Sequence, residues 1–409
     1  YNGVWSLSTQ YQYVGDWPKA LPSSMGIFAG GQGADDGTQL NVIEFFDIAT
    51  TGNTTDFGDT TTARRSGAGA GSSTRGLIIG GIAAAATVDF ISMTSKGNAQ
   101  DFGDLTAATS NLGAFSNNTR AVTGGGADAG STDVNIMEYF TIASAGDATD
   151  FGDLVAASQT QGLASPTRGV FGGGYNNSGV NNVIQYITIA SAGDATDFGD
   201  LSVTRYQTGT AASSVRGIFA GGNTGSNSNV IDYITIASTG DATDFGNLLG
   251  IAKGMGGVSS NIRAVFMGGA TNAYQNVMQY VTIGTTGNAQ DFGDLVGTKG
   301  EPAGAFQNSV ASGVWNLQDQ YDYRRGGNWP ETGNALSRAI FFDGVASLQY
   351  VEIATTGNTL DFGDGPAKNN SGGTGSNTRG VFKGSDEVAI YQIQWATLGN
   401  STSFGDLTV

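Results

Sequence analysis

The chain has 409 residues, with 35 acidic and 18 basic side chains and a formal net charge of −17. This charge disfavours binding to nucleic acid or to an anionic membrane. The sequence contains neither histidine nor cysteine, which excludes disulfides, thiolate metal sites, and Ser-His-Asp or Cys-His catalysis. The longest weakly polar run, residues 76–88, is too short to cross a bilayer, so we expect no membrane insertion.

Glycine is far more frequent than proline, with 66 residues against six, so glycines mark most of the breaks between segments. Glycine favours tight, flexible turns between short segments. The segments between glycines are filled with Val, Ile, Phe, Tyr and Thr, and no long stretch shows the apolar spacing of a helix. The composition therefore predicts an all-β fold.

The chain begins with a tryptophan-rich element that later returns. Trp5 and Trp17, in residues 3–18, correspond to Trp315 and Trp329 in residues 313–330. Paired tryptophans in a duplicated element are more often packing anchors than a sugar site. We assign them a structural role.

A DFGD-like tetrapeptide then recurs along the chain. Its phenylalanines are Phe57, Phe102, Phe151, Phe198, Phe245, Phe292, Phe362 and Phe404, and the first six are 45 to 49 residues apart. This period is typical of a four-stranded β-propeller blade. The Asp-Phe-Gly string also occurs in protein kinases, but its repetition here argues against that interpretation.

Residues 201–247 show the repeated unit clearly. Glycines and small polar residues divide it into four segments, which we expect to be strands. The predicted strands lie near residues 208–214, 216–222, 230–237 and 241–248. The third has apolar residues on both faces, as expected for a strand covered on each side.

The repeat resembles the kelch motif. Gly172-Gly173 end a hydrophobic strand, Tyr186 lies in a later strand, Phe198 stands in the fourth, and Arg205 precedes the next repeat. The kelch family usually has tryptophan where this chain has the DFGD phenylalanine. The resemblance implies a kelch-like β-propeller of four-stranded blades, about seven or eight in number.

The repeats suggest two domains, and they allow two alternatives for how the ring of blades closes. Residues 1–312 hold a tryptophan element and six DFGD repeats, and residues 313–409 hold a second tryptophan element and two more repeats. In one alternative, residues 302–310 supply a missing first strand to a blade built from residues 1–18, which closes about seven blades. In the other, all eight repeats share one ring.

An arginine precedes the second strand of most repeats. A feature that recurs in every blade is usually architectural. We expect each arginine to bond a DFGD aspartate or a backbone carbonyl near the junction of two blades. The set comprises Arg75, Arg120, Arg168, Arg216, Arg263, Arg338 and Arg379.

Aspartates at every third residue make a weak calcium candidate. Asp147, Asp150 and Asp153 could gather oxygen ligands in a turn, and the following repeat has the same pattern. The alternative is that these side chains bond backbone groups of the turn. We favour the second interpretation and expect no cofactor.

The loops between the second and third strands differ most among repeats. They should emerge on one face and are rich in Asn, Ser, Gly and occasional Tyr, which suits hydrogen bonding and stacking on sugar rings. Plain solvated loops are the alternative. The candidate binding residues are Asp35, Asp36, Tyr175, Asn176, Asn177, Asn223, Asn227 and Tyr274.

The tryptophan element and the TIASAGDATDFGDL repeats resemble virion structural proteins of marine, cyanophage-like bacteriophages. The resemblance implies a non-enzymatic tail-fibre or particle-surface protein, located on the virion or outside the cell. Its expected partners are a host receptor or glycan, other virion proteins and further copies of itself. The alternative is a bacterial surface or filament adhesion protein. A two-carboxylate glycosidase is disfavoured because the acidic residues belong to the repeat.

Overall fold

The computed structural model describes residues 24–33, 37–83, 86–308, 338–342, 347–352, 360–364, 372–375, 379–383, 388–394 and 400–407. These residues form strands, turns and bends, which confirms the all-β prediction. The described part of the chain contains no apolar helix long enough to span a bilayer. The chain divides into two compact units, Tyr1–Gly326 and Gly327–Val409.

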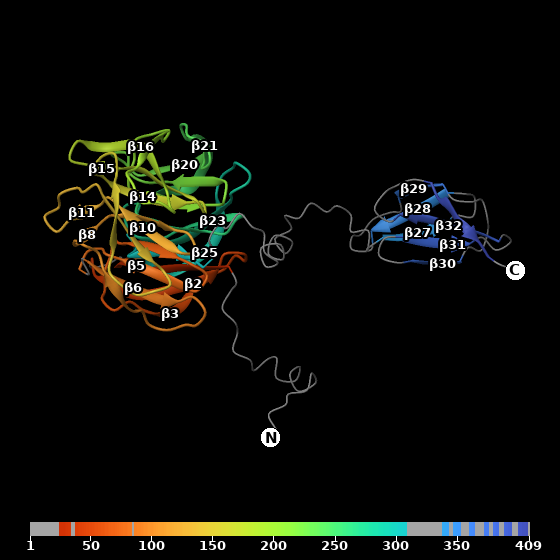
Figure 1. Ribbon diagram of the computed structural model, residues 1–409, viewed down its shortest axis with the longest axis horizontal. Coiled ribbons are helices and arrows are strands. Elements are labelled where there is room, and N and C mark those ends of the chain that lie inside the picture. Colours follow the sequence, from red (N-terminus) through yellow and green to blue (C-terminus); the bar gives the residue numbers. More distant parts are fainter. Residues whose placement is uncertain are drawn as a thin grey trace, which may run out of the picture. The chain divides into compact units, whose positions relative to one another are not determined.

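The described part of unit 1 contains four antiparallel sheets of four strands, one sheet of eight strands and one short strand pair (Figure 1). The eight-stranded sheet consists of two four-stranded halves that are joined only by two residue pairs between β25 and β1. We number these halves separately, as sheets 1 and 6, and the other four-stranded sheets as sheets 2 to 5. Sheet 1 comprises β26 (Gly304–Gln307), β1 (Met25–Gly33), β2 (Gln39–Asp47) and β3 (Thr55–Asp59). Sheet 2 comprises β4 (Ala68–Gly71), β5 (Arg75–Ile79), β6 (Thr87–Ser92) and β7 (Gln100–Asp104). Sheet 3 comprises β9 (Gly113–Ser116), β10 (Arg120–Gly124), β12 (Ile136–Thr141) and β13 (Thr149–Asp153).

The remaining three sheets repeat this order. Sheet 4 comprises β14 (Gln159–Ala164), β15 (Arg168–Asn176), β16 (Gly179–Thr188) and β17 (Thr196–Asp200). Sheet 5 comprises β18 (Gly209–Ala212), β19 (Arg216–Ala220), β20 (Ser228–Thr235) and β21 (Thr243–Ala252). Sheet 6 comprises β22 (Gly256–Ser259), β23 (Arg263–Met267), β24 (Gln275–Thr282) and β25 (Gln290–Gly300). A short pair, β8 (Thr109–Ser110) with β11 (Ala127–Asp128), adjoins sheet 3.

Sheet 5 confirms the four strands predicted for residues 201–247, within a few residues at each end. Its order, β18-β19-β20-β21, is the order along the chain, so each strand pairs with the one before it. We call these the first, second, third and fourth strand of a sheet, and use the same terms for the other five.

Sheet 1 takes its first strand from the far end of unit 1. β26 pairs antiparallel with β1, with Gly26 opposite Gln307 and Ala29 opposite Gly304. The expectation that residues 302–310 supply a missing first strand thus holds, but their partner strand lies in residues 25–33. Residues 1–18, the partner proposed from the sequence, lie outside the described residues. Sheet 6 also touches sheet 1, because Gly300 in β25 pairs with Gln32 in β1.

The core lies between neighbouring sheets. Each of six clusters of buried apolar side chains joins two successive sheets, and one of them joins sheet 6 to sheet 1. In that cluster Phe28 and Phe46 of sheet 1 pack with Val265 and Phe292 of sheet 6. The first strands also contact one another in sequence, from β4 through β9, β14, β18 and β22 to β26, which in turn contacts β4. Burial on both faces therefore continues through all six sheets without a break.

The DFGD sequence has a physical reason to recur. In unit 1 its phenylalanine is buried, as with Phe198, which packs edge-on against Tyr186 of the third strand at 5.9 Å between ring centroids. The glycine that follows, Gly199, has φ of 142°, and a Cβ there would lie 2.5 Å from the backbone of Gly240 in the next sheet. A side chain at this position would collide with the neighbouring turn, so glycine is required.

Unit 2 carries the last two DFGD repeats in two sheets. The first comprises β27 (Arg338–Phe342), β28 (Ser347–Glu352) and β29 (Leu360–Asp364). The second comprises β30 (Gly372–Gly375), β31 (Arg379–Lys383), β32 (Ala389–Gln394) and β33 (Thr402–Asp406). Among the described residues, unit 1 holds six DFGD repeats, one in each of sheets 1 to 6, where the sequence suggested seven or eight units.

Candidate functional site

The repeated arginine joins one sheet to the next. Arg168 starts the second strand of sheet 4, and its guanidinium lies over the ring of Tyr186 in the same sheet, 4.3 Å from the centroid. Its Nη1 donates a hydrogen bond of 2.8 Å to the carbonyl of Ile236 in sheet 5. The cation thus stacks on its own sheet and bonds to its neighbour.

Four other arginines repeat this geometry. The equivalent bonds run from Arg75 to Ile142, Arg120 to Ile189, Arg216 to Ile283, and Arg263 to Ile48 and Ala49. The last bond goes from sheet 6 to sheet 1. Of the two partners expected from the sequence, the structure has the backbone carbonyl. Arg338 and Arg379 begin strands of unit 2, but their side chains lie outside the described residues.

Aspartates just before the DFGD motif accept hydrogen bonds from the backbone of the preceding sheet. The Asp147 carboxylate accepts a hydrogen bond of 3.1 Å from the backbone N–H of Asp104 in the preceding sheet, and Asp194 accepts one of 3.0 Å from Asp153. Asp147, Asp150 and Asp153 are exposed. Within the described residues, no three acidic side chains are grouped so that they could hold a metal ion. Asp147 thus bonds a backbone group, as we favoured over calcium binding, but this group belongs to the preceding sheet and not to the turn of Asp147.

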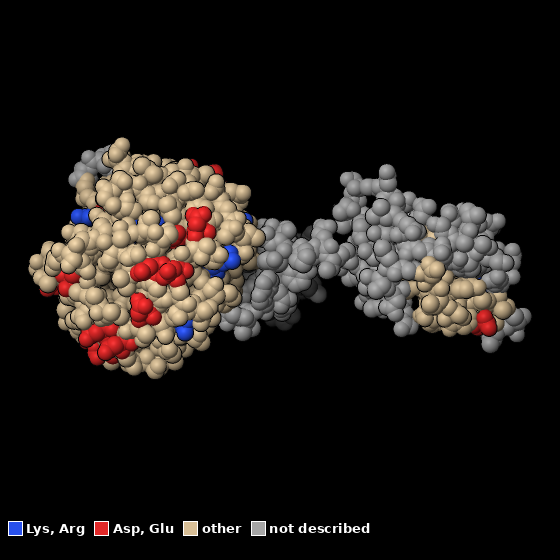
Figure 2. Space-filling view, turned by 90° about the horizontal axis from the view of Figure 1, so that it is seen from above, with Lys and Arg blue, Asp and Glu red and all other residues tan. Residues whose placement is uncertain are grey.

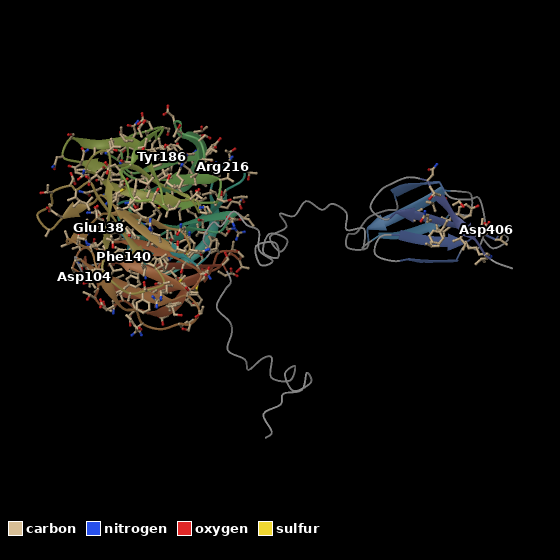
Figure 3. The ribbon with its side chains drawn as sticks, viewed as in Figure 1. Asp104, Glu138, Phe140, Tyr186, Arg216 and Asp406 are labelled. Carbon is tan, nitrogen blue, oxygen red and sulfur yellow. The ribbon has the colours of Figure 1, made fainter. Side chains whose placement is uncertain are left out.

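A buried polar side chain occupies one position in every third strand, just before the aromatic residue. Its oxygen accepts a hydrogen bond from a backbone N–H in the connection that leads from the preceding sheet. The residues are Glu44, Asp89, Glu138, Gln185, Asp232 and Gln279. Glu138 is labelled within unit 1 in Figure 3. The same backbone group is thus satisfied by a carboxylate in some sheets and by a neutral amide in others.

Three of these carboxylates have a buried cation as partner. Arg205 bonds Asp232 at 2.7 Å, and both side chains are fully buried. Arg64 pairs with Asp89 in the same way, and Lys299 pairs with Glu44. Burial lowers the pKa of Arg205, and the opposing charge of Asp232 counteracts this effect. Sequence reasoning used Arg205 only as a marker of the kelch motif and missed its partner.

One predicted binding residue, Tyr175, is exposed and forms an aromatic pair. Tyr175, at the end of β15, is 39% exposed, and its ring lies 5.4 Å from that of Tyr206, which follows sheet 4. The adjacent Asn177 is exposed, and Asn176 accepts a backbone hydrogen bond from Ser178. Sequence reasoning missed Tyr206 because it falls in a connection rather than in a variable loop.

Other predicted loop residues bond neighbouring loops. The Asn227 amide donates hydrogen bonds to the carbonyls of Ala270 and Thr271 in sheet 6, and Asn223 accepts one from Gly225. The Tyr274 hydroxyl donates to Gln32 of sheet 1 at 2.6 Å. Burial and the nearby charge of Glu301 raise the pKa of Tyr274. These contacts fix the loops of sheets 5, 6 and 1 against one another.

A central cavity runs between the first strands of all six sheets. Its volume is about 110 Å³, and its walls are mostly glycine, alanine and other small residues of β4, β9, β14, β18, β22 and β26. A second cavity of about 50 Å³ shares Gly67, Gln161, Thr208, Met255 and Pro302 with the first. The two are therefore adjacent, and we call the second the mouth of the central cavity. The mouth adds the polar residues Ser66, Asn111, Gln207 and Glu301.

Some predicted residues lie outside the described part of the chain. They are Asp35 and Asp36 of the first variable loop, and the tryptophans Trp5, Trp17, Trp315 and Trp329. The surface that Figure 2 shows carries several separate groups of acidic side chains and fewer basic ones, in keeping with the net charge of the chain.

Comparison with known proteins adds no relative. No protein-family model matches the chain, and no curated protein sequence matches it. The functional argument therefore depends on the geometry described above.

Proposed function

We propose that this chain is a non-enzymatic surface component of a bacteriophage particle that binds a host receptor or a neighbouring subunit through the loops of a β-propeller. In this proposal the six sheets of unit 1 are the blades, and β26 closes the ring. Support comes from the inter-sheet arginine bonds and the apolar clusters, both of which continue from sheet 6 to sheet 1.

One observation carries the binding role. The exposed Tyr175 and the half-buried Tyr206 form an aromatic pair on the side of unit 1 where the second strands end. On the same side, Asn227 and Tyr274 bond neighbouring loops. Loops held in one conformation lose little entropy on binding, and exposed tyrosines supply contact area with a polar end. The sequence offers no histidine or cysteine for common nucleophile and base pairs.

The location is tested by immunogold labelling of purified phage particles and of uninfected marine cyanobacterial cells. We expect label on particles. Label confined to cells would overturn the virion assignment in favour of a bacterial surface protein.

Binding is tested with fluorescently labelled full-length chain on the same cells. We expect Tyr175→Ala to reduce cell binding about tenfold, because the aromatic contact is lost, whereas Tyr175→Phe should retain most of it. Undiminished binding by Tyr175→Ala would remove this face from the proposal.

A further inference from the structure

At the mouth of the central cavity, five of the six sheets contribute a residue with the same backbone conformation, and sheet 4 does not. Ser66, Asn111, Gln207 and Glu301 adopt left-handed backbone conformations, with φ between 49° and 55°, and Gly254 has φ of 63°. These five residues come from the connections that lead into sheets 2, 3, 5, 6 and 1. Non-glycine residues rarely adopt this conformation, and when they do they often mark a functional position.

Backbone hydrogen bonds link the five residues in series. Gly254 donates to Gln207, Glu301 to Gly254, Ser66 to Glu301, and Asn111 to Ser66, at distances of 2.7 to 3.0 Å. The series runs through sheets 5, 6, 1, 2 and 3. At sheet 4 the pattern changes, because β14 has a register shift between Gln159 and Gln161 instead.

Polar groups without partners gather beside this break. Thr208 lines both cavities and is 2% exposed, and its buried hydroxyl has no hydrogen-bond partner among the described residues. The side-chain oxygen of Gln207 is likewise buried and unpartnered in the described part of the chain. A buried polar group without a hydrogen-bond partner is unfavourable, so these two groups indicate a place for a hydrogen-bonding ligand or water.

The surrounding groups narrow the chemistry of that ligand. Gln161, Gln207 and Asn111 supply amides, and Thr208 supplies a hydroxyl. The one carboxylate, Glu301, pairs with Arg65 and accepts a hydrogen bond from Ser66, so its charge is already compensated. Met255 and Pro302 add apolar surface. Neutral donors and acceptors beside apolar surface suit hydroxyl groups carried on a carbon ring.

We propose that the mouth of the central cavity binds a neutral sugar, as a free monosaccharide or as the terminal residue of a surface glycan, with Thr208 and Gln207 as direct hydrogen-bonding partners. This inference rests on the proposed receptor-binding function, because it names the chemical class of the receptor. The volumes of the two cavities limit the occupant to about one sugar residue.

The test uses full-length chain and a panel of free glucose, galactose, mannose and N-acetylglucosamine at millimolar concentration. Binding is measured by saturation-transfer NMR and titration calorimetry. We expect at least one sugar to bind the wild type, and Thr208→Val to weaken that binding about tenfold. Because the hydroxyl has no protein partner, we expect Thr208→Val to melt at the same temperature as the wild type or higher.

The chain offers a matched control for this variant. Thr160 occupies the corresponding position of sheet 4, is 1% exposed, and also has an unpartnered hydroxyl among the described residues, but it does not line the mouth. Thr160→Val should therefore leave sugar affinity unchanged. A second variant, Gln207→Gly, copies the glycine that sheet 6 carries at this position, Gly254, and should weaken binding without loss of fold.

Three results would overturn the inference: binding of no sugar by the wild type, equal affinity in Thr208→Val, or an equal loss in Thr160→Val. In the first case the mouth holds only water. If the wild type still binds cells in any of these cases, the proposed function stands without the sugar site. If the chain binds sugar at the mouth but attaches to neither cells nor particles, the sugar site stands and the proposed function fails.

Discussion

Sheets 5 and 6 each supply a buried acceptor for an equivalent backbone N–H, but they use different side chains. In sheet 5, Asp232 accepts the backbone N–H of Ser202, and the buried Arg205 neutralises the carboxylate. In sheet 6, Gln279 accepts the equivalent N–H of Leu249, and the position that corresponds to Arg205 is Ala252. The architecture therefore needs an acceptor at this place but not a charge. In sheet 5, where the acceptor is a fully buried carboxylate, a buried cation compensates its charge.

The largest expected effect comes from breaking the ion pair of sheet 5. Arg205→Ala leaves Asp232 buried with no cation, and we expect it to lower the free energy of unfolding by about 3–5 kcal/mol. The double variant Arg205→Ala with Asp232→Gln reproduces the residue pair of sheet 6 and should recover most of that loss. Urea denaturation of the three proteins measures both effects. A single variant within about 1 kcal/mol of the wild type would contradict the comparison.

A smaller effect is expected from Arg216, which joins sheet 5 to sheet 6. Arg216→Ala removes the bond from sheet 5 to the Ile283 carbonyl of sheet 6 and the stacking on Tyr233. We expect a loss of about 1–2 kcal/mol, because the group is partly exposed. The exposed neighbour Val215 provides the control, since Val215→Ala should change stability by less than about 0.5 kcal/mol. Equal melting curves for both variants would refute an architectural role for Arg216.

The smallest expected effect extends the comparison to sheet 3. Glu138 is 6% exposed and takes part in none of the described ion pairs, although it accepts the N–H of Thr106. Glu138→Gln gives sheet 3 the neutral acceptor of sheets 4 and 6. We expect stability at neutral pH to rise by up to about 1 kcal/mol, as judged by calorimetric melting. A clear loss of stability would show that sheet 3 depends on the charge.

Much of this arrangement could be predicted from the sequence. The period of DFGD located the fourth strands, and the glycines and β-branched residues located the other three in sheet 5. Two of the ion pairs also leave a signal, because Arg64 and Arg205 each precede a third strand that carries Asp, whereas the partner of Lys299 lies 255 residues earlier in the chain. This correspondence between a basic and an acidic residue indicates an ion pair only once the two segments are known to be in contact.

The mouth of the central cavity could not be predicted in the same way. Gln159-Thr160-Gln161 looks no different from the polar connections before other sheets, yet it adopts a register shift where five other connections place a left-handed residue. The backbone conformation of one connection depends on its neighbours in the ring of contacts, and those neighbours are distant in sequence. For the same reason, the sequence predicted β26 as a first strand but did not predict that β1 is its partner.

The pairing of β26 with β1 has a mechanical consequence. The two strands are antiparallel, Met25 donates a backbone hydrogen bond to the side chain of Asn308, and Gly26 lies opposite Gln307. Met25 and Asn308 therefore lie at the same end of this strand pair. A force that pulls these two residues apart would break the hydrogen bonds of the pair one after another from that end, rather than load all of them together in shear. Sheet 1 would thus be the first of the six sheets to lose a strand.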